Sequence, residues 1–338
     1  MTRFLPCVRT AAHEPCSEQA LHIAVLQRLA ALPILLCVSY AAAQCPPAAW
    51  VPGIGSPGFD GDVYAVTVLQ DGDVIAAGSY RSAGGNPASC IARYHPASGI
   101  WSPMGMGTDI GSVWALATAP NGDLIAGGGF SEVGSVTVNN IGRYRPSTGI
   151  WSPLGAGMPG GGVQCVAVLP DGDVLVGGRF TTAGRIAANC IARFHPETNT
   201  WTALGSGVSG PSYTTVNAIA LLADGTAIAA GTFDTAGGLA ANNIARYNPS
   251  TGEWSALGAG TDDQILSLTV LDDGDVLAGG LFTTAGETPA RQLARFDAAT
   301  TTWSEFGGIT EDTILPWSMQ VIADGDIVLG GYFTALAG

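Results

Sequence analysis

DGDVLVGGRFTTAGRIAANCIARFHPETNTW, residues 171–201, is the stretch that decides the fold of this 338-residue chain. It begins with an Asp-Gly turn, which supplies the positive φ angles of a tight hairpin and is the strongest short hairpin signal. Two apolar, β-prone segments follow: 174–178, which ends in a glycine pair, and 191–194. A second turn leads to Trp201. Together with the apolar run 163–169 that precedes it, the stretch predicts four short antiparallel strands.

The same unit recurs along most of the chain. Tryptophans mark its period at intervals of 51, 50, 50, 53 and 49 residues: Trp50, Trp101, Trp151, Trp201, Trp254 and Trp303. Asp-Gly or Asn-Gly turns recur in step with them, beginning at residues 71, 121, 171, 224, 273 and 324. A fixed period of this length indicates a repeat architecture, in which each unit stacks on its neighbours.

Four-stranded antiparallel units of this length are the blades of a β-propeller. One such sheet cannot bury both faces, but a ring can, because each blade packs on two neighbours. The sequence therefore predicts an all-β propeller over residues 44–338, with about six blades, or seven if the natural chain is longer. The sixth unit stops at Gly338, before its third strand, so its blade is incomplete. A strand at Trp50 could complete that blade and close the ring.

The unit also carries a family resemblance. A glycine pair, an aromatic residue, Pro, Thr and Trp follow in order, as in Gly177-Gly178, Phe194, Pro196, Thr198 and Trp201. This order resembles the kelch repeat, whose propellers include the central domain of galactose oxidase. The stretch 233–247 also resembles Rax2-type fungal repeats and bacterial delta-60 repeats. The resemblance covers roughly residues 50–338 and implies a propeller but no single activity, because kelch-like propellers serve both in binding and in catalysis.

The charge of the chain excludes some partners. Its formal net charge is -14, and its 13 basic residues are all arginine. Nucleic-acid binding and docking on anionic lipid both need clustered positive charge, so we expect neither. Cations, neutral sugars and basic partners stay open, as does the interpretation that the acidity serves solubility alone.

Residues 1–43 differ from the repeats. Arg28 precedes the apolar run 29–38, and small residues follow it up to Ala43. A charged start, a short apolar stretch and small residues before a cleavage point are typical of a secretory signal peptide. The run is too short for a comfortable membrane span. We therefore predict a signal peptide over 1–43 and a secreted or cell-surface mature protein, monomeric and without a membrane span.

Four cysteines follow the predicted cleavage point: Cys45, Cys90, Cys165 and Cys190. Cys90 and Cys190 occupy the same repeat position two units apart, which is too far for a disulfide. Cys165 falls in a predicted innermost strand, where we expect a buried thiol. A Cys45–Cys90 bond stays open.

Residues present in every unit are expected to be structural, because a side chain repeated around a ring cannot easily define one off-axis site. The repeated tryptophans should pack between blades with their indole N–H groups satisfied locally. The repeated arginines should pair with nearby carboxylates or carbonyls. These tryptophans are Trp101, Trp151, Trp201, Trp254 and Trp303, and these arginines are Arg93, Arg143, Arg193, Arg246 and Arg295.

Function is expected where the repeats differ. The second position of the innermost strand holds Tyr64, Trp114, Gln164, Asn217, Leu266 and Trp317 in turn. These side chains lie either in the core between blades or at the central channel. In the second case Tyr64, Trp114 and Trp317 would form an aromatic rim suited to a sugar ring or a peptide side chain.

The loops that enter each innermost strand also vary, and several carry carboxylates. The candidate ligand residues among them are Asp109, Asp262, Asp263 and Asp312. Converging carboxylates could bind Ca²⁺, which favours oxygen ligands, but no segment has the spacing of a known calcium loop. We predict solvated loops and neither a metal site nor a cofactor, with calcium left open.

Catalysis finds little support in the sequence. The mature chain holds two histidines, His95 and His195, at one turn position that varies between blades, so we expect them to be exposed. No zinc, copper or phosphate-binding pattern is visible. The leading hypothesis is a binding or scaffold propeller that recognises a protein or glycan through variable loops on one face. A carbohydrate-active enzyme that uses loop carboxylates and a structural repeat protein of the cell envelope are the alternatives.

Overall fold

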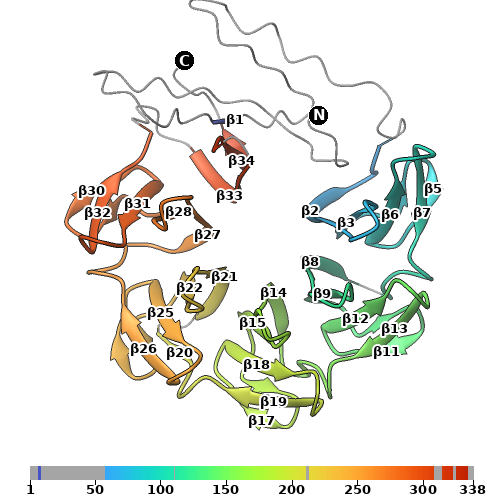
Figure 1. Ribbon diagram of the computed structural model, residues 1–338, viewed down its shortest axis with the longest axis horizontal. Helices are drawn as coiled ribbons and strands as arrows, with labels where there is room; N and C mark the ends of the chain where they lie inside the picture. The colour runs from blue at the N-terminus through green and yellow to red at the C-terminus, as the bar shows by residue number, and fades with distance from the viewer. Residues whose placement is uncertain are drawn as a thin grey trace, which may run out of the picture.

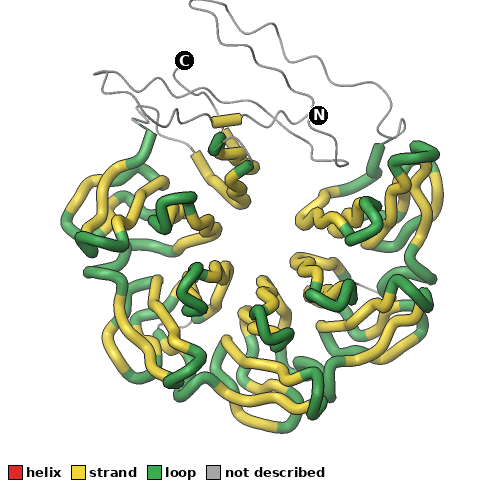
Figure 2. Tube along the Cα trace, viewed as in Figure 1, coloured by secondary structure: helices red, strands yellow, loops and turns green. Residues whose placement is uncertain are grey.

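The computed structural model describes residues 7–8, 58–109, 111–210, 213–307, 314–322 and 325–333. Every regular element in these ranges is a β-strand (Figure 2). The strands form small sheets arranged around a central axis as the blades of a propeller (Figure 1). The predicted all-β propeller is thus confirmed. No helix in the described ranges is long and apolar enough to cross a membrane.

Five blades contain four antiparallel strands each, ordered from the axis outward (Figure 1). Blade 1 has β2 (Asp62–Val68), β3 (Val74–Ser79), β6 (Ile91–His95) and β7 (Ile100–Pro103); blade 2 has β8 (Ser112–Thr118), β9 (Leu124–Gly129), β12 (Ile141–Arg145) and β13 (Ile150–Pro153); blade 3 has β14 (Gly162–Val168), β15 (Val174–Arg179), β18 (Ile191–His195) and β19 (Thr200–Ala203). Blade 4 has β21 (Thr215–Leu221), β22 (Ala227–Thr232), β25 (Ile244–Asn248) and β26 (Glu253–Ala256); blade 5 has β27 (Ile265–Val270), β28 (Val276–Gly280), β31 (Leu293–Asp297) and β32 (Thr302–Glu305).

A short ribbon lies between the second and third strands of each of these blades. The ribbons are β4 (Ser82–Ala83) with β5 (Asn86–Pro87), β10 (Glu132–Val133) with β11 (Val136–Thr137), β16 (Thr182–Ala183) with β17 (Ile186–Ala187), β23 (Thr235–Ala236) with β24 (Leu239–Ala240) and β20 (Val208–Ser209), and β29 (Thr284–Ala285) with β30 (Thr288–Pro289). The turn of each ribbon contains a glycine that lies against a tryptophan ring. A β-carbon on Gly184, for example, would lie 2.7 Å from Cδ1 of Trp201, so the position admits only glycine.

The sixth sheet contains β33 (Ile314–Val321) and β34 (Ile327–Phe333). The free edge of β34 pairs with β1 (Cys7–Val8), with Cys7 opposite Val328. The third position of this sheet is therefore occupied by residues that fall within the predicted signal peptide. The strand expected at Trp50 lies outside the described residues.

Neighbouring blades are held together by their innermost strands, which pack successively from β2 to β33. The glycine pairs make this packing possible: a β-carbon on Gly127 of blade 2 would lie 2.3 Å from Val163 Cγ1 of blade 3. The first valine of the strand is fully buried at Val163, whereas its counterpart Val63 is 36% exposed. Figure 1 shows β2 and β33 apart, and within the described ranges no blade covers this face of blade 1.

The Asp-Gly turns differ in detail from the expected hairpin. In blade 1 the Gly72 N–H donates to the Leu69 carbonyl at 3.0 Å, and the Leu69 N–H donates to the Asp73 carbonyl at 2.8 Å. Of residues 69–73, which form this turn, only Gly72 has a positive φ, of 87°. The turn is therefore a type I turn closed by one left-handed glycine, not a two-residue turn with two positive φ angles.

Every innermost strand has an irregular register within its first four residues. The extra residues are Tyr64, Trp114, Gln164, Asn217, Leu266 and Trp317. A bulge leaves one residue outside the ladder and changes the direction of its side chain. The bulge position, which varies between repeats, is thus one that the ladder leaves free to vary.

Candidate functional site

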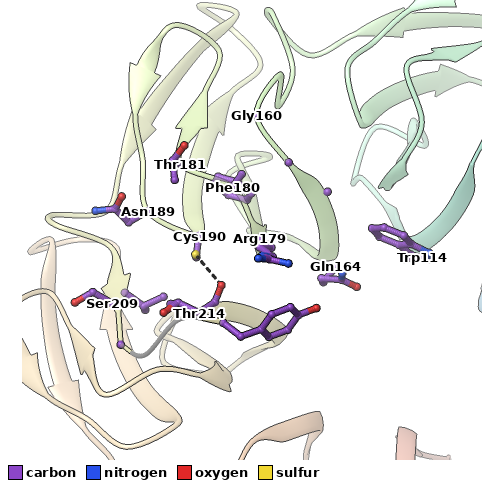
Figure 3. A pocket seen from close by; sticks show the side chains of 15 residues that line it. Trp114, Gly160, Gln164, Arg179, Phe180, Thr181, Asn189, Cys190, Ser209 and Thr214 are labelled. Carbon is purple, nitrogen blue, oxygen red and sulfur yellow. Dashed lines mark hydrogen bonds between the residues drawn. The ribbon is translucent and has the colours of Figure 1, made fainter.

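An open cavity of about 770 Å³ lies at the junction of blades 3 and 4 (Figure 3). This volume falls in the range of small-molecule sites. Blade 3 contributes the ends of β14 and β15, the loop that enters blade 4 contributes a second wall, and one side chain comes from blade 2. The lining residues are Trp114, Gly160, Gly161, Gly162, Gln164, Arg179, Phe180, Thr181, Asn189, Cys190, Val208, Ser209, Gly210, Tyr213 and Thr214.

The cavity lies beside the longest loop between blades. From Trp201 to the first buried valine of the next inner strand, Val216, the chain advances 15 residues (216 − 201). The corresponding step from Trp151 to Val163 is 12 residues (163 − 151). Tyr213 lies in this longer loop and is 56% exposed. The insertion accounts for the unusual interval of 53 residues between two tryptophans.

Arg179 is the charged side chain of the cavity. It lies at the end of β15, opposite Gly162 of β14, and is exposed. Its guanidinium carbon lies 4.3 Å from the centre of the Tyr213 ring, which is a cation–π contact. Among the described residues, no carboxylate forms an ion pair with Arg179, and none of the lining residues is acidic. The same position in the other blades holds Ser79, Gly129, Thr232, Leu281 and Tyr332.

Trp114 forms the blade 2 side of the cavity. Its indole lies over two glycines: a β-carbon on Gly129 would lie 2.8 Å from Cη2, and one on Gly162 would lie 2.5 Å from Cζ3. The ring therefore spans two blades and is held by backbone on both. Gln164, the bulge residue of the next blade, lies beside it in the same wall (Figure 3). Two neighbouring bulges thus contribute side chains to one site.

Cys190 is a buried residue whose thiol lines the cavity. Its backbone is left-handed, with φ of 62°, at a position that blades 2 and 4 fill with Asn140 and Asn243. Sγ donates to the Thr214 carbonyl at 3.5 Å (Figure 3), as Asn243 Nδ2 donates to the Thr261 carbonyl at 2.9 Å. Burial raises the pKa of the Cys190 thiol, against the opposing charge of Arg179. A protonated thiol is a poor nucleophile, so Cys190 serves as a hydrogen-bond donor.

The predicted rim and the predicted carboxylates do not meet at this cavity. Of the three rim aromatics, Trp114 lines it, while Tyr64 and Trp317, 46% and 54% exposed, hold the equivalent bulges in blades 1 and 6. Asp109 and Asp262 each brace their own blade, and Asp312 lies outside the described residues.

Asp262 shows what the loop carboxylates do. Its oxygens accept hydrogen bonds from the backbone N–H groups of Thr283 and Thr284, both at 2.8 Å, and from the Thr283 hydroxyl at 2.6 Å. Burial alone would raise the pKa of Asp262, but these bonds outweigh it and lower the pKa. Asp109 accepts from the Ser131 and Glu132 N–H groups in the same way. Each carboxylate fixes the loop after the second strand.

Asp263 lies next to this brace and accepts the Gln264 N–H at 2.6 Å. In the described part of the chain, no three His, Cys, Asp or Glu side chains converge in a way that could hold a metal ion. Asp109, Asp262 and Asp263, the predicted carboxylates within the described ranges, therefore form no such cluster.

The repeated tryptophans link the blades. Each indole N–H donates to a carbonyl of the preceding blade at 3.0–3.2 Å: Trp151 to Met104, Trp201 to Leu154, Trp254 to Leu204, and Trp303 to Leu257. Each of these rings also packs on the aromatic residue of the third strand, with centroids 4.9–5.1 Å apart. Trp101 instead adds a contact with Phe59, at 4.8 Å.

The repeated arginines brace the Asp-Gly-Asp turns. Arg193 donates from Nε to Asp173 at 2.6 Å and from Nη2 to Asp171 at 2.7 Å. Arg93 and Arg295 repeat this pattern on Asp71 with Asp73 and on Asp273 with Asp275, and Arg246 pairs with Asp224 and Thr226. In blade 2, where Asn121 replaces the first aspartate, Arg143 donates to the Ser152 hydroxyl at 3.3 Å, and its Nε lies 3.8 Å from Asp123.

Both histidines pair with an aspartate of these turns. His95 Nδ1 lies 2.6 Å from Asp73, and its Nε2 lies 2.9 Å from the Ser102 hydroxyl. This order resembles a hydrolase triad, but the Ser102 hydroxyl also donates to the Arg93 carbonyl at 3.3 Å, and Asp73 is shared with Arg93. Blade 3 repeats the pattern with Asp173, His195 and Thr202, and blade 2 replaces the histidine with Arg145. A motif repeated with such substitutions indicates cross-strand bracing.

The fold and these repeated braces define a β-propeller repeat protein. Two family models match parts of the chain. The Rax2 C-terminal beta propeller domain matches residues 210–327, and a domain of unknown function, the DUF5122 beta-propeller, matches residues 69–99 and 169–197. Each match covers less than half of the chain. No match was found among curated proteins.

Solved structures share the fold. The extracellular domain of a protein described as a one component system, from B. thetaiotaomicron, superposes with a TM-score of 0.54 and 16% identity over 80% of this chain and 31% of that chain. One described as the extracellular domain of a hybrid two component system gives 0.51 and 16%, over 82% and 34%. Virginiamycin B lyase from Staphylococcus aureus gives 0.51 and 16%, over 81% and 80%. The chain spans about a third of the length of the first two. Likeness at this identity shows the fold alone.

Proposed function

We propose that this chain is a secreted or cell-surface binding propeller that holds a carbohydrate in the cavity at the junction of blades 3 and 4. The observation that carries the proposal is that Gln164, Arg179 and Tyr213, which have no counterpart of the same type in the other blades, line an open cavity together with Trp114. Variable loops on a rigid scaffold are the usual place of a binding site.

The chemistry of the lining suits a sugar. Trp114 and Tyr213 offer aromatic faces, and apolar C–H surfaces of a pyranose can pack on such faces. Gln164 offers an amide that can exchange hydrogen bonds with sugar hydroxyls. Asn189 and Ser209 also line the cavity, but Asn189 Nδ2 donates to the Ser206 carbonyl at 2.9 Å and the Ser209 hydroxyl bonds the Thr235 hydroxyl at 2.6 Å. A few polar groups placed around a largely apolar surface fix the orientation of a ligand.

Binding is favoured over hydrolysis at this cavity. Glycoside hydrolysis needs a pair of carboxyl groups on either side of the scissile bond. The lining residues of this cavity include no Asp or Glu, and Asp109 and Asp262, two of the carboxylates that the sequence offered, brace loops in their own blades. The proposed function includes no cofactor and no bound metal. It also treats the mature protein as a monomer with a kelch-type repeat, from which a signal peptide over 1–43 has been cleaved.

A glycan array tests this function on the folded protein without residues 1–43. We expect binding to at least one oligosaccharide, and Trp114→Ala to weaken it about tenfold, the size expected for loss of one aromatic contact. Tyr64→Ala is the matched control, because it removes an aromatic from the equivalent bulge of another blade. Binding that survives Trp114→Ala but not Tyr64→Ala would place the site elsewhere and contradict the proposal.

A further inference from the structure

We infer that this cavity selects sugars that carry a carboxylate, and that Arg179 binds the carboxylate. The inference rests on the proposed carbohydrate site and names the class of ligand it takes. It follows from the charge, the geometry and the surroundings of one side chain.

The charge of the cavity is opposite to that of the chain. The protein has a formal net charge of -14, yet the lining residues include one arginine and no acid. Arg93, Arg193 and Arg295 are all neutralised by two aspartates each. Arg179, by contrast, pairs with no carboxylate in the described ranges. An uncompensated guanidinium in an acidic protein is suited to an anion that arrives from outside.

The geometry keeps the donors of Arg179 available. Tyr213 lies against the guanidinium with the carbon 4.3 Å from the ring centre. A cation–π contact uses the face or carbon of the group, whereas its five N–H donors lie in the guanidinium plane. No side chain or carbonyl of the described residues accepts a hydrogen bond from Arg179. The planar edge can therefore form the bidentate pair that arginine makes with carboxylates.

The position is also fixed before a ligand arrives. Arg179 leaves β15 opposite Gly162, and Trp114 lies over that same glycine. The cation and the aromatic wall therefore flank one short piece of backbone. A sugar ring packed on Trp114 can place a ring carboxylate toward Arg179 while its hydroxyls meet the Gln164 amide. An acidic peptide would use Arg179 but would leave the Trp114 face and the Gln164 amide without matched partners, so we favour a uronic acid.

The test uses oligosaccharides that contain uronic acids, each beside its carboxyl-reduced partner, which keeps every hydroxyl and removes the charge. The probes are tetragalacturonate, a hyaluronan tetrasaccharide and an alginate tetramer, with their reduced forms, measured by calorimetry on the protein without residues 1–43. We expect at least one acidic probe to bind about 10- to 100-fold more tightly than its reduced partner, the gain of a charge-assisted pair. Arg179→Gln should abolish that difference and leave the affinity for the reduced partner unchanged.

The control is Arg185→Gln, which removes the same charge from an exposed ribbon turn of the same blade. It should leave the preference for the acidic probe intact. Equal affinity for both partners, with loss of binding in Trp114→Ala, would overturn the acidic preference and keep the sugar site. Binding of an acidic peptide such as hexaglutamate but of no oligosaccharide would overturn both. An acidic preference that Arg179→Gln leaves intact would overturn the role of Arg179.

Discussion

The outer strands and the inner-strand bulges of this propeller behave in opposite ways. At the outer strands, Trp201 and Arg193 repeat the contacts that their counterparts make in other blades, down to the same donor atoms. At the bulges, six positions that share one backbone geometry carry five different residue types. Because stability in repeat proteins is spread over similar interfaces, one junction can change its surface without changing the fold. The difference indicates that bracing contacts and variable side chains occupy separate layers of each blade.

The strongest test of this separation removes a repeated tryptophan. Trp201 is 7% exposed, packs on Phe194 at 4.9 Å and donates to the Leu154 carbonyl of the preceding blade. Trp201→Ala should lower the free energy of unfolding by about 3–5 kcal/mol, measured by urea denaturation, because it leaves a cavity and an unpaired carbonyl. Trp114→Ala is the matched change at a bulge and should cost less than about 1.5 kcal/mol. Equal losses would break the comparison.

A glycine of the blade interface gives the next largest effect. A β-carbon on Gly177 would lie 2.5 Å from Cys165 Sγ and 2.6 Å from Val216 Cγ1, so Gly177→Ala should push blades 3 and 4 apart and cost about 1–3 kcal/mol. A β-carbon on Gly160, at the rim of the cavity, would meet only side-chain hydroxyls, those of Thr182 at 3.1 Å and Thr181 at 3.8 Å, so Gly160→Ala should leave the melting temperature nearly unchanged. Thermal melts followed by circular dichroism measure both. A stable Gly177→Ala variant would mean that the interface is looser than these distances require.

Two arginines of the same blade sharpen the comparison. Arg193 forms two charge-assisted bonds to the 171–173 turn and has a side chain only 17% exposed, so Arg193→Met should cost about 1–2 kcal/mol of unfolding free energy. Arg179→Met should change it by less than about 0.5 kcal/mol, because an exposed side chain without an ion pair contributes little. Urea titrations of the two variants measure both changes in the free energy of unfolding. A larger loss in Arg179→Met would assign that residue to the bracing layer.

The two layers also differ in what the sequence could predict. The tryptophan period and the Asp-Gly turns predicted four-stranded blades, because the six copies of the pattern can be compared with one another. Tyr213 and Arg179 each occur once, so repetition gave no sign of them. Two signals could have found them: the three extra residues after Trp201, and an arginine where the other blades have Ser, Gly, Thr, Leu or Tyr. Whether such residues meet depends on the bulge and on the path of one loop, which composition does not specify.

The carboxylates Asp109 and Asp262 were predicted as ligand groups, but the structure gives them a bracing role. Asp109 and Asp262 break the exact repeat, since blades 3 and 4 lack them, and so they were expected as possible ligand groups. The structure shows that each accepts two backbone N–H bonds from a loop of its own blade. Their partners are backbone groups, which have no signature in the sequence, and for that reason a bracing aspartate and a ligand-binding aspartate could not be told apart.

The smallest expected effect tests this bracing by pH. The bonds to Asp262 lower its pKa in the folded protein, while the unfolded value is about 3.9. Its stabilising contribution is therefore fully present above about pH 4 and is lost as the pH falls through the lower folded pKa. Asp262→Asn should cost less than about 1 kcal/mol at pH 7, because the group is largely exposed and screened by solvent. The difference from the unmodified protein should shrink as the pH drops below 4, measured by urea denaturation. Asp234→Asn, at an exposed carboxylate that accepts no bond from the described residues, is the control. A difference for Asp262→Asn that grows toward low pH would reverse the sign of the shift and remove Asp262 from the bracing layer.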